Sequence, residues 1–153
     1  MGSEWQSATL GDISTTRNGA GIKQAHFATS GVPLARVSNF TTDSIDLSGC
    51  GFVSRDHALL WKDHQIKQGD VLIATVGSMP PNWSSVVGKV IRAPKGAEGA
   101  IQNQNTCCVR AIDGIADQTF LYYALRSREF IDFAVNVAAG SANQARLPPC
   151  QRS

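Results

Sequence analysis

Charged residues are scarce in this chain of 153 residues: Asp, Glu, Lys and Arg together make up 17% of it, and the net charge is only +2. Hydrophobic residues make up 42%, a proportion typical of globular proteins and not of disordered chains. No apolar run approaches the roughly 20 residues that a membrane-spanning helix needs. The N-terminal residues lack the basic and apolar segments of a signal peptide. We therefore expect one cytoplasmic domain with a single core and no membrane partner.

Metal-binding and catalytic patterns are also missing from the sequence. The four cysteines form no C-x-x-C pair and have no histidine at ligand spacing, which favours reduced thiols over a zinc site or a disulfide framework. There is no P-loop and no dinucleotide fingerprint. His57 and His64 each follow an aspartate, but no serine in a nucleophile-elbow context accompanies them. We therefore expect a protein that is not an enzyme and that holds no metal ion and no cofactor.

Acidic residues are absent from three stretches that do contain basic ones. These stretches are residues 13–42 with Arg17, Lys23 and Arg36, residues 71–97 with Lys89, Arg92 and Lys95, and residues 133–153 with Arg146 and Arg152. A polyphosphate partner favours such loops, because each phosphate that a cation neutralises releases counterions. Chance clustering in a chain with few charges would give the same pattern, so charge alone leaves both explanations open.

The pattern of apolar residues and turns predicts a sheet-rich domain. Apolar runs bounded by glycine-containing turns predict strands at 13–17, 32–37, 70–76 and 86–92, with one or two more within 100–112. A short helix is predicted after Ser54, and one long helix is predicted from Asp117 to about Asn136, with Ser54 and Asp117 as N-caps. Few helices separate the strands. The pattern therefore favours the α+β class, with a curved, mostly antiparallel, barrel-like sheet and one long C-terminal helix.

Amide side chains gather beside one predicted strand end and after one predicted turn. The first group is Gln102, Asn103, Gln104 and Asn105, and the second is Asn143 and Gln144, with Arg146 close behind. Amides can pair with adenine, and arginine with guanine, in the major groove of DNA. The same amides could instead cap strand ends and satisfy loop backbone. Trp83, in a proline-containing loop, could likewise contact a base or sugar or fill a gap in the core.

Four short motifs give the sequence a resemblance to a known family. They are Lys67-Gln68-Gly69-Asp70-Val71-Leu72, Gly77-Ser78, Asn103-Gln104 and the segment from Phe120 to Ser127. In this order and spacing they resemble the target recognition domain of a type I restriction-modification specificity subunit, over residues 5–147. The resemblance implies a globular α/β domain with a bent sheet. It also implies a domain that reads DNA sequence for a methyltransferase and carries out no chemistry itself.

The resemblance further implies which residues face double-stranded DNA. Loops at one edge of such a domain contact DNA, with basic side chains mostly on phosphates and amides and some arginines on base edges. Carried over by position, the DNA-facing residues are Arg17, Asn18, Lys23, Gln24, Arg36, Ser38, Asn39, Ser78, Asn82, Trp83, Lys89, Gln102, Asn103, Asn105, Asn143, Gln144 and Arg146. The modification and restriction subunits of such a system are further candidate partners, and a homodimer is another.

The resemblance predicts a single recognition domain over residues 1–147 and a tail over residues 148–153. In the family, a Pro-Pro segment leads into a long spacer helix between two recognition domains. Here Pro148-Pro149 is followed by four residues, so we expect the spacer helix to be missing. One small module would bind DNA more weakly than a reader with two modules.

Two other classes of function stay open on the sequence. A protein-interaction or decoy module would bind methyltransferase subunits, or a second copy of the chain, through the sheet face and the helix at 117–136. Apolar residues on the outer face of that helix would favour it. A small enzyme on a β-rich scaffold would need an acid, base or nucleophile set, which the sequence does not offer.

Overall fold

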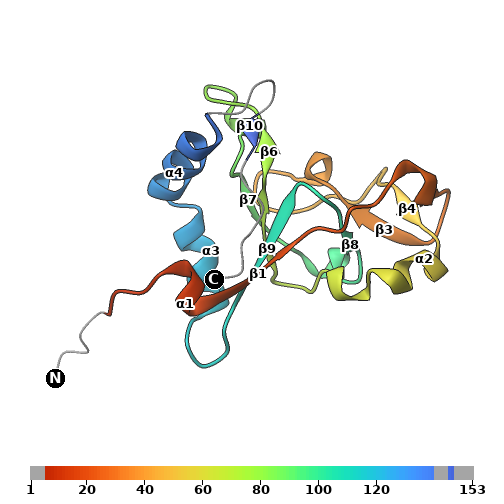
Figure 1. Cartoon of the computed structure of the whole chain (residues 1–153), viewed down its shortest axis with the longest axis horizontal. Coiled ribbons are helices and arrows are strands. Elements are labelled where there is room, and N and C mark those ends of the chain that lie inside the picture. Colours follow the sequence, from red (N-terminus) through yellow and green to blue (C-terminus); the bar gives the residue numbers. More distant parts are fainter. Residues whose placement is uncertain (1–5, 140–144, 147–153) are drawn as a thin grey trace.

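The computed structural model describes residues 6–139 and the backbone of residues 145–146. Two four-stranded sheets lie side by side (Figure 1). The sheet on the right in Figure 1 carries the short helix α2 (Arg55–Leu60). The central sheet is flanked by α3 (Gln118–Leu125) and α4 (Arg128–Ala138). No helix among these residues is long and apolar enough to cross a membrane.

The central sheet is antiparallel throughout and has the strand order β1-β9-β5-β7. Its strands are β1 (Ser14–Asn18), which follows the short helix α1 (Leu10–Ile13), β5 (Val71–Ala74), β7 (Val90–Arg92) and β9 (Thr106–Ala111). Every residue of β5 is buried, because both faces of the sheet are covered. Val71 and Ile73 pack with Leu121 of α3, whereas Leu72 packs with Ile91 on the other face.

The second sheet has the strand order β2-β4-β3-β8. Its strands are β2 (Phe27–Ala28), β3 (Val32–Ala35), β4 (Phe52–Val53) and β8 (Ile101–Gln102). Only the β3–β8 pair is parallel within these two described sheets. A further short pair joins β6 (Val76–Gly77) to β10 (Ala145–Arg146). The predicted α+β class with mostly antiparallel strands is confirmed, and the strands are divided between sheets.

The helical region near the C-terminus consists of two helices and not the single helix predicted at 117–136. Asp117 caps α3 as predicted, by accepting a hydrogen bond from the Phe120 amide. The Ser127 hydroxyl then accepts a hydrogen bond from the Phe130 amide at 3.3 Å and begins α4. A serine that captures a free amide in this way starts a new helix, even where the apolar pattern continues. Arg126 and Arg128 therefore flank a bend.

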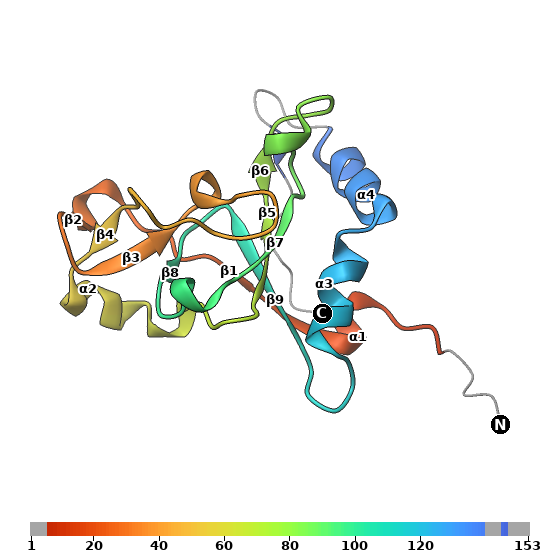
Figure 2. The ribbon, with the colours of Figure 1, turned by 180° about the vertical axis from the view of Figure 1, so that it is seen from behind.

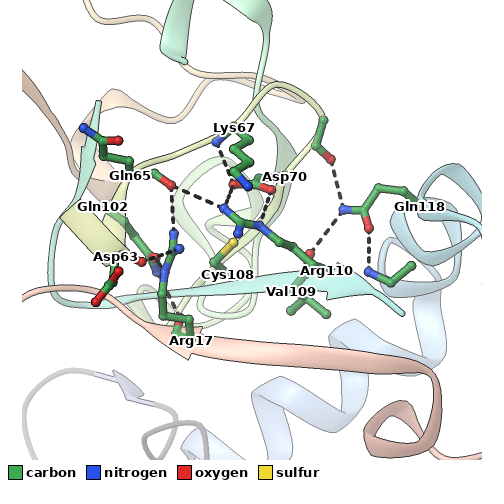
Figure 3. Close-up of polar contacts among 12 residues, drawn as sticks. Arg17, Asp63, Gln65, Lys67, Asp70, Gln102, Cys108, Val109, Arg110 and Gln118 are labelled. Carbon is green, nitrogen blue, oxygen red and sulfur yellow. Dashed lines mark hydrogen bonds and ion pairs between the residues drawn. The ribbon is translucent and has the colours of Figure 1, made fainter. Parts of the chain in front are cut away.

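The Lys67–Leu72 motif is a structural turn that leads into β5. Gly69 has a φ of +88°, a conformation that glycine adopts without strain. The buried Asp70 carboxylate accepts a hydrogen bond from the Lys67 amide at 2.8 Å. It also accepts two from Arg110 of β9, at 2.7 and 2.8 Å (Figure 3). This paired contact fixes the register of β5 against β9. The motif that carries the family resemblance therefore has a structural role.

The cysteines differ from the prediction. Cys107 is disulfide-bonded, so the expectation of four reduced thiols is wrong at this position. Cysteine spacing in a sequence does not establish which cysteines form disulfides. Cys50 and Cys108 are free and buried. Burial raises the pKa of the Cys108 thiol to about 12, so this thiol is protonated and unreactive at neutral pH.

Candidate nucleic-acid interface

Loops from four distant parts of the sequence lie along one edge of the molecule. They are residues 19–26, 36–40, 78–88 and 103–105, and we call them the loop edge. In Figure 1 they occupy the upper side, with the β6–β7 loop towards the left and the turn before β2 at the right, while α2 lies along the lower side. The view from behind shows the same arrangement (Figure 2). No acidic residue occurs in any of the four segments.

Backbone hydrogen bonds join three of these segments into one unit. Ala20 donates to the Gln102 carbonyl and accepts from the Gln104 amide, both at 2.9 Å, and the Asn103 amide donates to the Ala35 carbonyl at 3.0 Å. A Cβ atom at Gly19 would lie 1.7 Å from the Asn103 carbonyl oxygen. Glycine at this position therefore permits the close approach of the first loop to the 103–105 turn.

A shallow hollow of about 300 Å³ lies where these segments meet. The predicted residues Arg36, Ser38, Asn103 and Asn105 line it together with the exposed Gln104. The Arg36 guanidinium lies 5.7 Å from the centre of the Phe27 ring, and its buried Nε has no hydrogen-bond partner among the described residues. The structure thus brings four predicted residues from two loops to one surface.

A second cavity, of about 520 Å³, lies between the β6–β7 loop and the bend between α3 and α4. Its lining includes Trp83, Lys89, Arg126 and Arg128, and we call it the basic pocket. The Arg128 guanidinium lies 5.1 Å from the centre of the Trp83 ring, an attractive cation–π contact. Sequence reasoning found Trp83 and Lys89 but not the two arginines. The bend at Ser127 places them at the pocket.

Arg17 and Gln102, both predicted to contact DNA, form hydrogen bonds with each other (Figure 3). Arg17 donates from Nε to the Gln102 Oε1 at 2.9 Å and from Nη1 to the Asp63 carbonyl at 2.7 Å. Gln102 is fully buried and donates back to the Arg17 carbonyl at 3.2 Å. Burial lowers the pKa of Arg17. The expectation that Gln102 faces DNA is corrected, because its side chain is fully buried. Arg17 is partly exposed, and its contact with DNA stays a prediction.

Two further predicted amides are buried and hold turns. The Asn39 Oδ1 accepts a hydrogen bond from the Arg36 amide at 3.0 Å, and the Asn103 Oδ1 accepts one from the Gln104 amide at 2.7 Å. The alternative that amides satisfy loop backbone therefore holds at these positions. The Ser78 hydroxyl is similarly hydrogen-bonded to the Ser85 hydroxyl at 2.9 Å.

The remaining predicted residues are mostly accessible. Asn18, Lys23, Gln24, Ser38, Asn82 and Trp83 are exposed, and Lys89 and Asn105 are partly exposed. Asn105 has a φ of +71°, which asparagine tolerates better than most residues. Asn143 and Gln144 lie outside the described residues, and the backbone of Arg146 pairs with Val76. No group of His, Cys, Asp or Glu side chains suited to a metal ion occurs in the described part of the chain.

A family model of the type I restriction modification DNA specificity domain matches residues 2–148. The chain belongs to this family. Its specificity-domain fold resembles that of an HsdS subunit from Thermoanaerobacter tengcongensis, with 16% identity and a TM-score of 0.53, over 80% of this chain and 30% of that one. An S subunit of a type I restriction-modification system from M. genitalium gives 14% identity and a TM-score of 0.56, over 95% of this chain and 32% of that one.

A third solved structure comes from a study of complex assembly and conformational transition in the type I R-M system. It gives 18% identity and a TM-score of 0.52, over 76% of this chain and 26% of that one. At these identities the similarity establishes the fold of the specificity domain. The chain spans about a third or less of the length of these solved chains. A search of curated proteins found no match.

Proposed function

We propose that this specificity domain recognises a sequence in double-stranded DNA as the target-reading module of a type I restriction-modification methyltransferase, and that it catalyses no reaction. The observation that carries the proposal is the loop edge, where four acid-free segments present exposed amide, hydroxyl and basic groups on one side. A surface without carboxylates does not repel phosphates, and a rigid set of donors and acceptors can read base edges.

Within this proposal residues of these loops and of the strands beside them have three roles. Lys23, Arg36 and Lys89 hold phosphates, whereas Gln24, Ser38, Asn82, Gln104 and Asn105 face base edges. The buried side chains of Asn39, Gln102 and Asn103, together with the partly exposed Arg17, keep the loops in place. Loops that are already ordered lose less conformational entropy when they bind. The third role therefore supports both phosphate binding and the reading of base edges.

The proposal includes the wider setting of the domain. Residues 1–147 form one recognition domain, and the modification subunit, with the restriction subunit in the full system, is the protein partner. The family assignment and the structural likeness to a chain from an assembled type I R-M system support this setting. A cytoplasmic location follows from the proposed access to chromosomal DNA.

Selection from a randomised duplex library tests this function. The purified chain is incubated with the library at low salt and then near physiological salt, and the retained duplexes are sequenced. We expect a short enriched motif that persists at higher salt, because base contacts carry sequence information and phosphate contacts do not. Retention without enrichment, lost as salt rises, would contradict sequence reading.

A pair of glutamine variants sharpens the selection. Gln104→Ala removes an exposed amide at the loop edge, and we expect it to relax preference at one base position, a loss of about 1–3 kcal/mol of discrimination. Gln68→Ala removes an equally exposed amide from the turn before β5 and is the matched control. Identical motifs from both variants and the parent would place the readout outside Gln104.

A second candidate function, a protein-interaction or decoy module, is favoured by one observation. Large apolar side chains are exposed on both C-terminal helices: Phe120 and Tyr123 on α3 are 57% and 65% exposed, and Phe133 on α4 is 61% exposed. Apolar residues on the outer helix face are what that function requires. It differs from DNA recognition in needing the helices and not the loop edge.

A further inference from the structure

Two cations of the basic pocket, Lys89 and Arg126, are held by neutral groups. The Lys89 ammonium donates to the Ser84 carbonyl at 2.8 Å. Arg126 donates to the Thr42 carbonyl at 3.4 Å and to the Tyr122 hydroxyl. Within residues 6–139 neither side chain forms an ion pair. Both positive charges are therefore fixed in position but not neutralised.

The electrostatics of the pocket favour an anion. No acidic residue lines the cavity, and Lys89, Arg126 and Arg128 all border it. Arg128 has a carboxylate partner in Asp132, but that pair is exposed to solvent. Burial, and to a lesser extent the charge of Arg126, lowers the pKa of Lys89. The fold therefore keeps the positive charges of Lys89 and Arg126 close enough to repel each other. An anion between them would relieve this repulsion.

We infer that the basic pocket binds one phosphodiester group of the DNA backbone, clamped between Lys89 and Arg126. The inference rests on the proposed function and adds Arg126 to its binding residues. An arginine can offer two parallel donors to phosphate oxygens, and a lysine adds a point charge. The cavity of about 520 Å³ is within the range of small-molecule sites, so the nucleotide next to that phosphate can lie against the Arg128–Trp83 pair.

This contact would set the position of the β6–β7 loop on the duplex. Trp83 and Lys89 belong to that loop, while Arg126 belongs to the bend between α3 and α4. A phosphate held by both elements therefore ties the loop edge to the helical side of the domain. Phosphate contacts of this kind fix register without reading sequence.

Charge-removing variants test the clamp. Lys89→Gln, Arg126→Gln and the double variant are compared with Lys62→Gln and Arg55→Gln, which remove exposed charges at or next to α2 on the opposite side of the molecule. Affinity for the selected duplex is measured across a salt series, and circular dichroism verifies folding. We expect each pocket variant to weaken binding about tenfold at fixed salt, and the controls to bind like the parent.

The double variant shows whether Lys89 and Arg126 hold the same phosphate or two different phosphates. If both cations hold the same phosphate, the double variant binds only slightly more weakly than either single variant, and the salt slope falls by about 0.9. If they hold separate phosphates, the losses multiply to about a hundredfold and the slope falls by about 1.8, which would overturn the shared clamp.

Neutral methylphosphonate linkages, placed one at a time along the duplex, test the clamp with the parent chain itself. We expect one position to weaken binding of the parent about tenfold and to have no effect on the double variant. A parent that does not bind duplex DNA at all would refute the proposed function. A parent that binds, with pocket variants matching the controls, would overturn the clamp alone.

Discussion

The side chains of Arg17 and Gln102 join β1, β8 and the segment at residues 63–65 (Figure 3). Gln102 accepts from Arg17 Nε and donates to the carbonyl oxygens of Arg17 and Thr106, both at 3.2 Å. A buried amide with all these partners contributes little net free energy, but removing it takes one hydrogen bond from each partner at a site that is closed to water. At the residue scale, the loops therefore depend on hydrogen bonds made within the fold.

Gln102→Ala should destabilise the fold rather than change DNA specificity. We expect its free energy of unfolding, measured by urea denaturation, to fall by about 2–3 kcal/mol, because Arg17 and the Thr106 hydroxyl lose a buried partner. Gln104→Ala, two residues further along but exposed, is the control and should change stability by less than about 0.5 kcal/mol. Equal midpoints for the two variants would refute the structural role.

The run from Gln102 to Asn105 shows which properties of single residues could be predicted from the sequence and which could not. The sequence places four consecutive amides beside a strand end, and in the structure they lie at and after the end of β8. Burial of Gln102 and Asn103, with Gln104 exposed, depends on the approach of residues 17–20 and 34–35, which are distant in sequence. Periodicity within the run carries no information about that tertiary contact.

Among the elements, the first loop and the 103–105 turn depend on the absence of a side chain at Gly19. An added Cβ would lie 1.7 Å from the Asn103 carbonyl oxygen, whereas one at Gly21 would meet only Gln104 Oε1 at 3.9 Å. At Gly19, the added atom would force the first loop and the 103–105 turn apart. At Gly21, the added atom would make an ordinary van der Waals contact. The two glycines therefore give a matched test within one loop.

Gly19→Ala should lower the free energy of unfolding by about 1–3 kcal/mol, the usual cost of overpacking, and should weaken specific DNA binding. Gly21→Ala should leave both unchanged, because its backbone is not in the left-handed region. Urea denaturation and titration of the selected duplex measure the two effects. Normal specific binding by a stably folded Gly19→Ala chain would show that the joined loops are not needed for recognition.

Short sequence patterns predicted the helices and strands better than they predicted the bend that divides the C-terminal helical region. The caps at Ser54 and Asp117 and the buried strand after Asp70 are confirmed, because each depends on side-chain chemistry a few residues away. The bend at Ser127 was missed, since apolar residues continue at helical spacing on both sides of it. Arg126 was therefore not recognised as a pocket residue.

On the scale of the whole molecule, two different surfaces compete to explain the function. The loop edge is free of acids and rich in polar groups, whereas α3 and α4 expose aromatic side chains on the flank of the central sheet (Figure 1). In the two proposals, DNA recognition uses the loop edge and the basic pocket, whereas protein association uses the exposed aromatic side chains of α3 and α4. Variants on one surface should therefore leave the other activity intact.

Sedimentation equilibrium of the double variant Tyr123→Ser/Phe133→Ser tests the helical surface. We expect the parent chain to associate as its concentration rises and the variant to remain monomeric, because exposed apolar patches of this kind mark protein interfaces. Leu60→Ser on α2 is the control, since Leu60 is also highly exposed, at 72%. Affinity for the selected duplex should be unchanged in both variants. Loss of DNA binding with retained association would reverse the assignment and place DNA on the helices.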